Sequence, residues 1–175
     1  MGGADKEVAE LAPDGGESEI GFADYLALTR LHADYAAVVD AGDWDAWVEL
    51  FVEDCVYRVQ PRENHERGFP LATLSLESKG MLKDRVYGIR ETLFHDPYYQ
   101  RHVVGAPRIL SVGLQGIRCE ANYAVIRTKL SEASTVFNVG RYLDLVVRTP
   151  QGLRFAVREC IYDSEMIPNS IIYPV

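Results

Sequence analysis

The histidines are the first side chains to weigh for chemistry, because an imidazole can bind a metal or move a proton near neutral pH. The chain has four of them, His32, His65, His95 and His102. No two are spaced as H-x-x-x-H, and no C-x-H or C-x-x-H pair occurs, so a Rieske iron–sulfur centre has no ligands here. A site of two histidines and one carboxylate for iron stays open on spacing alone.

One histidine stands in a suggestive setting, the stretch "YYQRHVVGAP", where His102 follows Arg101. Alternation along a predicted strand puts Tyr142 and Asp144 on one face. If Asp144 lay beside His102, the pair would make a general base with its partner. In that hypothesis His102, Asp144 and Tyr142 form an acid–base set, and Tyr57 is a further donor in a pocket.

The interpretation that we favour for these polar side chains is structural. Buried charges in sheets are usually paired to satisfy one another rather than to react. Arg101, His102, Asp144 and Arg158 are then ion pairs within the sheet or contacts at a subunit interface. No G-x-S-x-G, no cysteine with a histidine nearby and no phosphate-binding glycine loop in a strand–turn–helix context occurs. We therefore predict no catalytic, cofactor-binding or metal-binding residue in this chain.

Composition narrows the classes of partner and the location. The chain has 175 residues and a formal net charge of −8, which argues against binding to nucleic acid or to anionic membranes. It has neither an apolar run long enough to span a membrane nor a basic-then-apolar leader, so we expect a cytoplasmic protein. Three cysteines, Cys55, Cys119 and Cys160, are widely spaced and are expected to be reduced.

The elements that must position these side chains follow from periodicity. Residues 1–18 are predicted to be a flexible acidic tail, and residues 19–175 a single α+β domain. Helical spacing begins at Glu19 and ends near Gly42, and Asp43 is expected to cap a second, short helix.

Further elements follow along the chain. A strand over 55–61, an irregular stretch over 62–77 and a helix over 78–94 come next, and then four alternating runs predict an antiparallel meander. These runs are 101–112, 117–130, 135–149 and 153–163. In the last run, strict alternation places Arg158 with Cys160 and puts Phe155 on the opposite face.

Several stretches together resemble one family. "VVDAGDWDAWVELFVEDCVYRV" resembles the helix–helix–strand opening of the small (beta) subunits of aromatic-ring-hydroxylating dioxygenases, which are Rieske non-haem iron oxygenase systems. "MLKDRVYGIRE", "YYQRHVVGAPRI", "VFNVGRYLDLVV", "LRFAVRECIYDSEMI" and a final "YPV" are similar to the segments that follow in that family. The resemblance runs from Tyr25 to Val175. The "CVYRV…ENHERG" variant is most similar to members that serve benzene carboxylates such as terephthalate, or salicylate-like acids.

The resemblance implies a fold and an assembly. The fold is a cone-shaped roll, the SnoaL-like architecture shared with nuclear transport factor, with helices packed on a strongly curved, mainly antiparallel sheet. The assembly is a hexamer of three large (alpha) and three small subunits, in which the small subunits also associate as a trimer. The Rieske [2Fe–2S] cluster and the mononuclear Fe(II) then belong to the large subunit. The small subunit is expected to be a non-catalytic scaffold in the catabolism of an aromatic compound.

Two other functions stay open at this point. The fold also includes dehydratases and isomerases, so the chain could be a stand-alone lyase or isomerase that uses the pocket of the cone. It could also be a homo-oligomeric module that binds a small molecule. Both would require polar side chains that converge on a cavity which solvent can reach.

Overall fold

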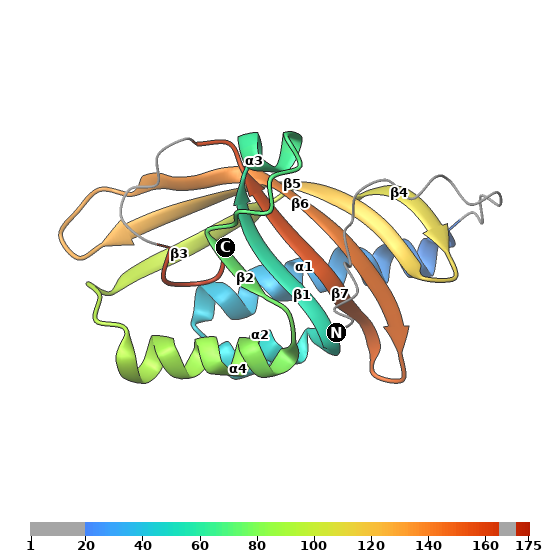
Figure 1. Cartoon of the computed structure of the whole chain (residues 1–175), viewed down its shortest axis with the longest axis horizontal. Helices are drawn as coiled ribbons and strands as arrows, with labels where there is room; N and C mark the ends of the chain where they lie inside the picture. The colour runs from blue at the N-terminus through green and yellow to red at the C-terminus, as the bar shows by residue number, and fades with distance from the viewer. Residues whose placement is uncertain (1–19, 165–170) are drawn as a thin grey trace.

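The fold is a seven-stranded curved sheet that arches across one long helix, as Figure 1 shows for this computed structural model. The structure describes residues 20–164 and 171–175. The tail predicted for residues 1–18 lies outside them. The elements are α1 (Phe22–Ala41), α2 (Trp44–Glu49), β1 (Phe51–Pro61), α3 (Arg62–Glu66), β2 (Leu74–Leu76), α4 (Lys79–Tyr87), a π-helical turn (Gly88–Thr92), β3 (Tyr98–Val104), β4 (Arg108–Gly113), β5 (Gly116–Lys129), β6 (Thr135–Thr149) and β7 (Gly152–Tyr162).

Helix α1 is the element that the sheet encloses. Its buried residues are Leu28, Leu31, His32, Tyr35 and Val39, which recur at steps of three and four and form one stripe. A polar side chain, His32, therefore stands in the middle of an otherwise apolar face. The stripe packs against β3 and β7, which fixes the helix across the inner face of the sheet.

The predicted end of α1 and the predicted start of α2 are both confirmed. Gly42 takes a left-handed conformation with φ of 70°, and the amides of Gly42 and Asp43 donate to the oxygens of Val39 and Val38. This is the Schellman arrangement, in which glycine avoids the penalty that a side chain would meet. The Asp43 side chain then accepts from the amide of Ala46 at 3.1 Å and caps α2.

The sheet has the strand order β2-β1-β7-β6-β5-β3, and β4 also pairs with β5. The β1–β7 pair is parallel and the remaining pairs are antiparallel, so the predicted mainly antiparallel sheet is confirmed. The predicted strand over 101–112 is two strands. Residues 105–107 interrupt it, where Pro107 has no amide to donate, and the long β5 pairs first with β4 and then with β3.

Other boundaries shift because of tertiary pairing. The first strand begins at Phe51 rather than at the predicted residue 55, because the Phe155 amide donates to the Leu50 oxygen beside it. The helix expected over 78–94 ends at Tyr87 and continues as a π-helical turn. The stretch expected to be irregular holds α3 and β2.

A β-bulge between β6 and β7 corrects the predicted faces of β7. Leu145 is opposite Val157 and Val146 is opposite Phe155, so Ala156 is an extra residue. The bulge turns Phe155 to the same inner face as Arg158, whereas strict alternation put them on opposite faces.

The core lies between α1 and the inner face of the sheet, and α2 and α4 close one end of it. A segment from the end of the chain also joins this core, and we call Ile171–Val175 the strap. Its Ile171 and Val175 are buried with the core residues, although β7 ends at Tyr162. Across the described ranges, no helix has the length and apolar character needed to cross a membrane.

Candidate functional site

An ion pair lies at the centre of the molecule, between neighbouring strands. Asp144 on β6 is directly opposite Arg158 on β7. Arg158 donates from Nε to Oδ1 at 3.0 Å and from Nη2 to Oδ2 at 2.8 Å, and both side chains are fully buried. The bidentate geometry is the arrangement in which a buried pair gains most, because each charge offsets the desolvation of the other.

Three aromatic rings surround the guanidinium of Arg158. Its Cζ lies 4.0 Å from the ring centre of Tyr35, 4.1 Å from that of Tyr142 and 3.9 Å from that of Phe155. The faces of these rings carry partial negative charge, which favours a cation that has lost its water. The bulge at Ala156 is what brings Phe155 into this group.

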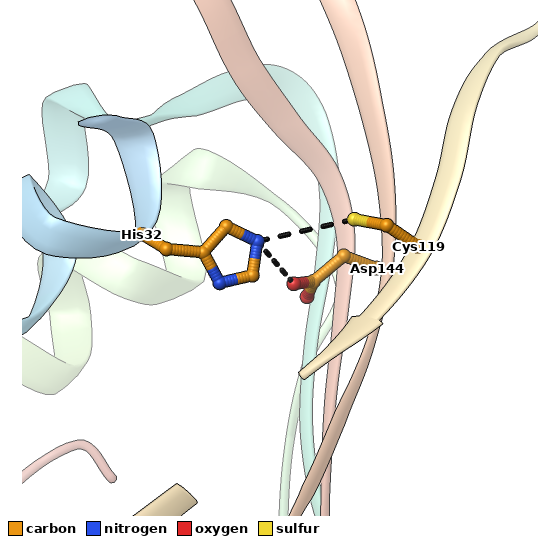
Figure 2. A group of neighbouring side chains, drawn as sticks. All are labelled: His32, Cys119 and Asp144. Atoms are coloured by element: carbon orange, nitrogen blue, oxygen red, sulfur yellow. Dashed lines mark hydrogen bonds and ion pairs between the residues drawn. The ribbon is translucent and has the colours of Figure 1, made fainter. Parts of the chain in front are cut away.

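His32 reaches the same ion pair from α1, as Figure 2 shows for its ring and the Asp144 carboxylate. Its Nε2 lies 3.3 Å from Asp144 Oδ2, and its Nδ1 lies 3.3 Å from Arg158 Nη2. Arginine can only donate, so Nδ1 must accept and the ring proton must be on Nε2. Burial and the positive charge of Arg158 lower the pKa of His32 to about 4, so the imidazole is neutral at pH 7.

The group His32, Cys119 and Asp144 has the ligand types of a metal site, and its ligand atoms lie within 4.8 Å of one another. The residues present do not fit a metal ion. His32 Nε2 would have to lose its proton to coordinate, and that proton would then move to Nδ1, which already faces the donor Nη2 of Arg158. The carboxylate is already neutralised by Arg158, and burial raises the pKa of the Cys119 thiol. His32 and Asp144 therefore belong to the ion-pair network of Arg158 rather than to a metal site.

His102 lies in a different polar group, at the C-terminal end of α1. Its Nδ1 is 2.6 Å from Asp40 Oδ1, and its amide donates to both carboxylate oxygens at 3.0 Å. Arg101 is 3.5 Å from Asp40 Oδ2, with 74% of its side chain exposed, while the His102 side chain is fully buried. His102 is thus hydrogen-bonded into the packing between α1 and β3.

The acid–base set of the lyase or isomerase hypothesis is not brought together. Asp144 contacts Arg158 and His32, and His102 contacts Asp40. The Tyr142 ring stacks on Tyr123 at 4.2 Å, and its hydroxyl is buried. Tyr57, expected to be a pocket donor, instead bonds to Val175 of the strap. These positions count against a catalytic pocket built from these residues.

The molecule resembles known proteins along most of its length. Residues 22–159 match the model of the SnoaL-like domain. The chain is 33% identical over 151 residues to the anthranilate 1,2-dioxygenase small subunit of Burkholderia cepacia, covering 86% of this chain and 94% of that protein. It is 28% identical to a terephthalate 1,2-dioxygenase beta subunit of a Comamonas species, covering 86% and 97%. The chain belongs to the small (beta) subunits of aromatic-ring-hydroxylating dioxygenases.

A solved structure agrees with this assignment. A Novosphingobium aromaticivorans protein assigned as the beta subunit of an aromatic-ring-hydroxylating dioxygenase is 32% identical to this small subunit and superposes with a TM-score of 0.79. The match covers 86% of this chain and 96% of that one. The predicted fold, a SnoaL-like roll with helices on a curved, mainly antiparallel sheet, is confirmed.

Sequence reasoning missed two residues that complete the polar groups of this small subunit. Sequence reasoning considers His32 only with the other histidines, as a metal ligand or proton carrier, and does not single out Asp40. The available signal was a polar residue at an inward position of an amphipathic helix, since such a side chain must find a partner when it is buried. Asp144 with Arg158 was among the pairs weighed, and Arg101 with Asp40 was not.

Proposed function

We propose that this chain is the structural small subunit of a multicomponent aromatic-ring-hydroxylating dioxygenase, and that it holds the catalytic large subunit in its assembled form. The observation that carries the proposal is the resemblance to named small subunits over 86% of the chain. The buried polar groups support it, because Asp144, Arg158 and His32 bond to one another inside the fold. The subunit itself is non-catalytic.

The substrate class of the assembled enzyme is a benzene carboxylate. Two relatives are named for anthranilate and terephthalate, and both compounds are benzene rings that carry a carboxylate. The pocket for this substrate belongs to the large subunit. Electrons from a nicotinamide cofactor reach that subunit through a reductase, and it holds a Rieske [2Fe–2S] cluster and a mononuclear Fe(II).

The proposed assembly contains three large and three small subunits and is cytoplasmic. The three free cysteines of this chain are in keeping with a reducing compartment. An obligate complex of this kind needs a contact surface on the order of 2,000 Å² or more.

An exposed patch on the outer face of β3, β5 and β6 supports a role in assembly. Tyr99 is 77% exposed, Val103 57% and Val136 65%, and Val139 on the same side is 41% exposed. The strand register puts Val103, Ala124 and Val139 in one row across the sheet. Contiguous exposed apolar side chains of this kind mark interaction sites, so we assign the patch to a subunit contact in the oxygenase.

Co-expression with the large subunit encoded beside its gene tests the proposed function. The two proteins should copurify, and light scattering after gel filtration should give the mass of a complex with three copies of each. The purified complex should oxidise a benzene carboxylate when a reductase and a nicotinamide cofactor are supplied. Separate elution of the two proteins at micromolar concentration would refute the proposal.

The patch is tested with a matched pair of variants. The double variant Tyr99→Glu with Val103→Glu places two charges in the assigned contact. It should reduce the yield of the assembled complex at least tenfold. Leu114→Glu changes a fully exposed side chain in the turn between β4 and β5, and this variant should leave assembly unchanged. Equal assembly by both variants would remove the patch from the interface.

A further inference from the structure

The strap ends in a cage of hydrogen-bond donors deep in the fold. The Val175 oxygen accepts from the Tyr35 hydroxyl at 2.6 Å, from the Tyr57 hydroxyl at 3.2 Å and from the Cys160 thiol at 3.4 Å. The Val175 amide donates back to the Tyr57 oxygen at 3.0 Å. Tyr35, Tyr57, Cys160 and Val175 are all fully buried. Three donors from α1, β1 and β7 thus converge on one oxygen atom.

These donors keep their protons at any ordinary pH. Burial raises the pKa of Tyr35 and of Tyr57 well above its usual value, and it raises the pKa of Cys160 to about 12. The hydroxyls and the thiol can therefore always donate, and the Val175 oxygen is the acceptor that they share. Because these donors are buried, a missing acceptor would leave each of them unsatisfied and would lower the stability of the fold.

The remaining strap contacts also resemble those of a bound peptide. Arg85 on α4 donates from Nη2 to the Ile171 and Ile172 oxygens, each at 2.8 Å. Gln100 on β3 donates to the Pro174 oxygen at 3.2 Å. Most of these bonds go from side chains of the fold to the main chain of the strap, as in the recognition of an extended peptide.

An aromatic pocket holds the one large side chain of the strap. The Tyr173 ring lies 5.1 Å from the Trp44 ring and 4.6 Å from the Tyr98 ring, and its hydroxyl is 2.6 Å from His95 Nε2. The strap therefore has an anchor side chain in a pocket, a main chain that is hydrogen-bonded by side chains and a final oxygen in a donor cage.

We propose that the interior of the cone is a ligand-binding site that this chain fills with its own strap. The site takes an apolar molecule that carries one hydrogen-bond-accepting oxygen, and the strap is its resident ligand. The oxygen goes to the cage of Tyr35, Tyr57 and Cys160, and the apolar body takes the place of the strap side chains. An accepting oxygen suits the cage, because its donors would otherwise be buried without a partner.

The proposal is tested on the complete chain, which folds with the strap in place. A sequence-specific protease site replaces residues 165–170, and the folded protein is then cut. The strap fragment should remain bound through gel filtration. A fluorescent IIYPV peptide in excess should displace it and bind with a Kd of about 1–100 µM. The peptide IIAPV, without the anchoring tyrosine, should bind at least tenfold more weakly.

Matched variants of the cut protein locate the site. Tyr35→Phe removes one cage donor and should weaken IIYPV binding about fivefold, the effect of one hydrogen bond. Tyr123→Phe removes a hydroxyl whose hydrogen bond goes to Asn138 at 2.6 Å rather than to the strap, so the variant should bind the peptide as the parent does. Equal weakening by both variants would overturn the assignment of the cage.

Small molecules test the class of ligand once the strap has been exchanged out. Benzamide has a ring and a carbonyl oxygen, and toluene has a similar ring without an acceptor. Benzamide at millimolar concentration should raise the Tm of the strap-free protein by several degrees, and toluene should not. Equal shifts would overturn the proposed role of the oxygen. Two further results would overturn the site itself. In the first, the cut protein loses its strap with no change in Tm and then binds no peptide. In the second, the strap-free protein unfolds and added peptide does not restore the fold.

Discussion

Two aspartate–histidine pairs join helix α1 to the sheet, and the helix contributes the histidine to one pair and the aspartate to the other. Near the middle of the helix, His32 is on α1 and Asp144 is on the sheet. At the end of the helix, Asp40 is on α1 and His102 is on the sheet. Each pair also has one arginine from a strand, Arg158 in the first and Arg101 in the second.

The two pairs differ in how the carboxylate is compensated. Arg158 is fully buried and holds Asp144 through two hydrogen bonds, whereas Arg101 is 74% exposed and lies 3.5 Å from Asp40. Asp40 relies instead on the His102 amide and ring. The fully buried Asp144 is neutralised by a fixed opposite charge, whereas Asp40, whose side chain is 6% exposed, is stabilised mainly by the dipoles of the His102 amide and ring. We therefore expect the Asp144 pair to contribute more to the free energy of unfolding than the Asp40 pair.

The largest expected effect comes from breaking the inner pair. Arg158→Leu leaves Asp144 buried without its counter-charge and should lower the free energy of unfolding by about 3–5 kcal/mol. Urea unfolding followed by the fluorescence of the buried Trp44 and Trp47 measures this. The double variant with Asp144→Leu should recover most of the loss. A double variant as unstable as Arg158→Leu would mean that packing, rather than charge, dominates.

The second effect is a dependence of the free energy of unfolding on pH, and it comes from His32 beside the Asp144–Arg158 pair. The pKa of His32 is about 4 in the fold and 6.5 without it, so between these values the unfolded chain binds a proton that the folded chain does not. Stability is therefore present above pH 6.5 and is lost as the pH falls towards 4. The loss reaches about 3 kcal/mol, at about 1.4 kcal/mol for each pH unit. Urea unfolding at pH 7, 5.5 and 4.5 should show a flatter profile for His32→Gln, and an unchanged profile would contradict this account.

The outer pair should respond less. Asp40→Ala leaves the amide and ring donor of buried His102 without their acceptor, at a cost of about 1–3 kcal/mol. Amide hydrogen exchange at His102 should accelerate together with the fall in the urea midpoint. If Asp40→Ala proved as costly as Arg158→Leu, the distinction between the two pairs would fail.

The smallest effect is expected from Arg101. Its side chain is mostly in water, so Arg101→Ala should change the unfolding free energy of the isolated chain by less than about 0.5 kcal/mol. Because Arg101 lies beside the exposed patch on β3, the same variant is informative in the complex. A clear loss of assembly with unchanged chain stability would place Arg101 at the subunit contact.

Much of the layout was predictable from local signals. The Gly42 stop, the Asp43 cap and the strand over 135–149 follow from spacing and turn chemistry, and the structure confirms them. The split of 101–112 into β3 and β4 and the bulge at Ala156 were not predictable, because both depend on which strand lies alongside. The strap could be matched to a family segment, but its burial in the core could not be deduced.

By itself, the sequence determined the periodicities of the helices and strands, the absence of Rieske spacing among its cysteines and histidines, and a family pattern running from Tyr25 to Val175. Only the tertiary structure decided that His32 rather than His102 joins Asp144, and that Tyr57 holds the strap. Local periodicity reports which face a residue takes. The partner of a buried charge lies far away along the chain and is chosen by register, by bulges and by the path of the last residues.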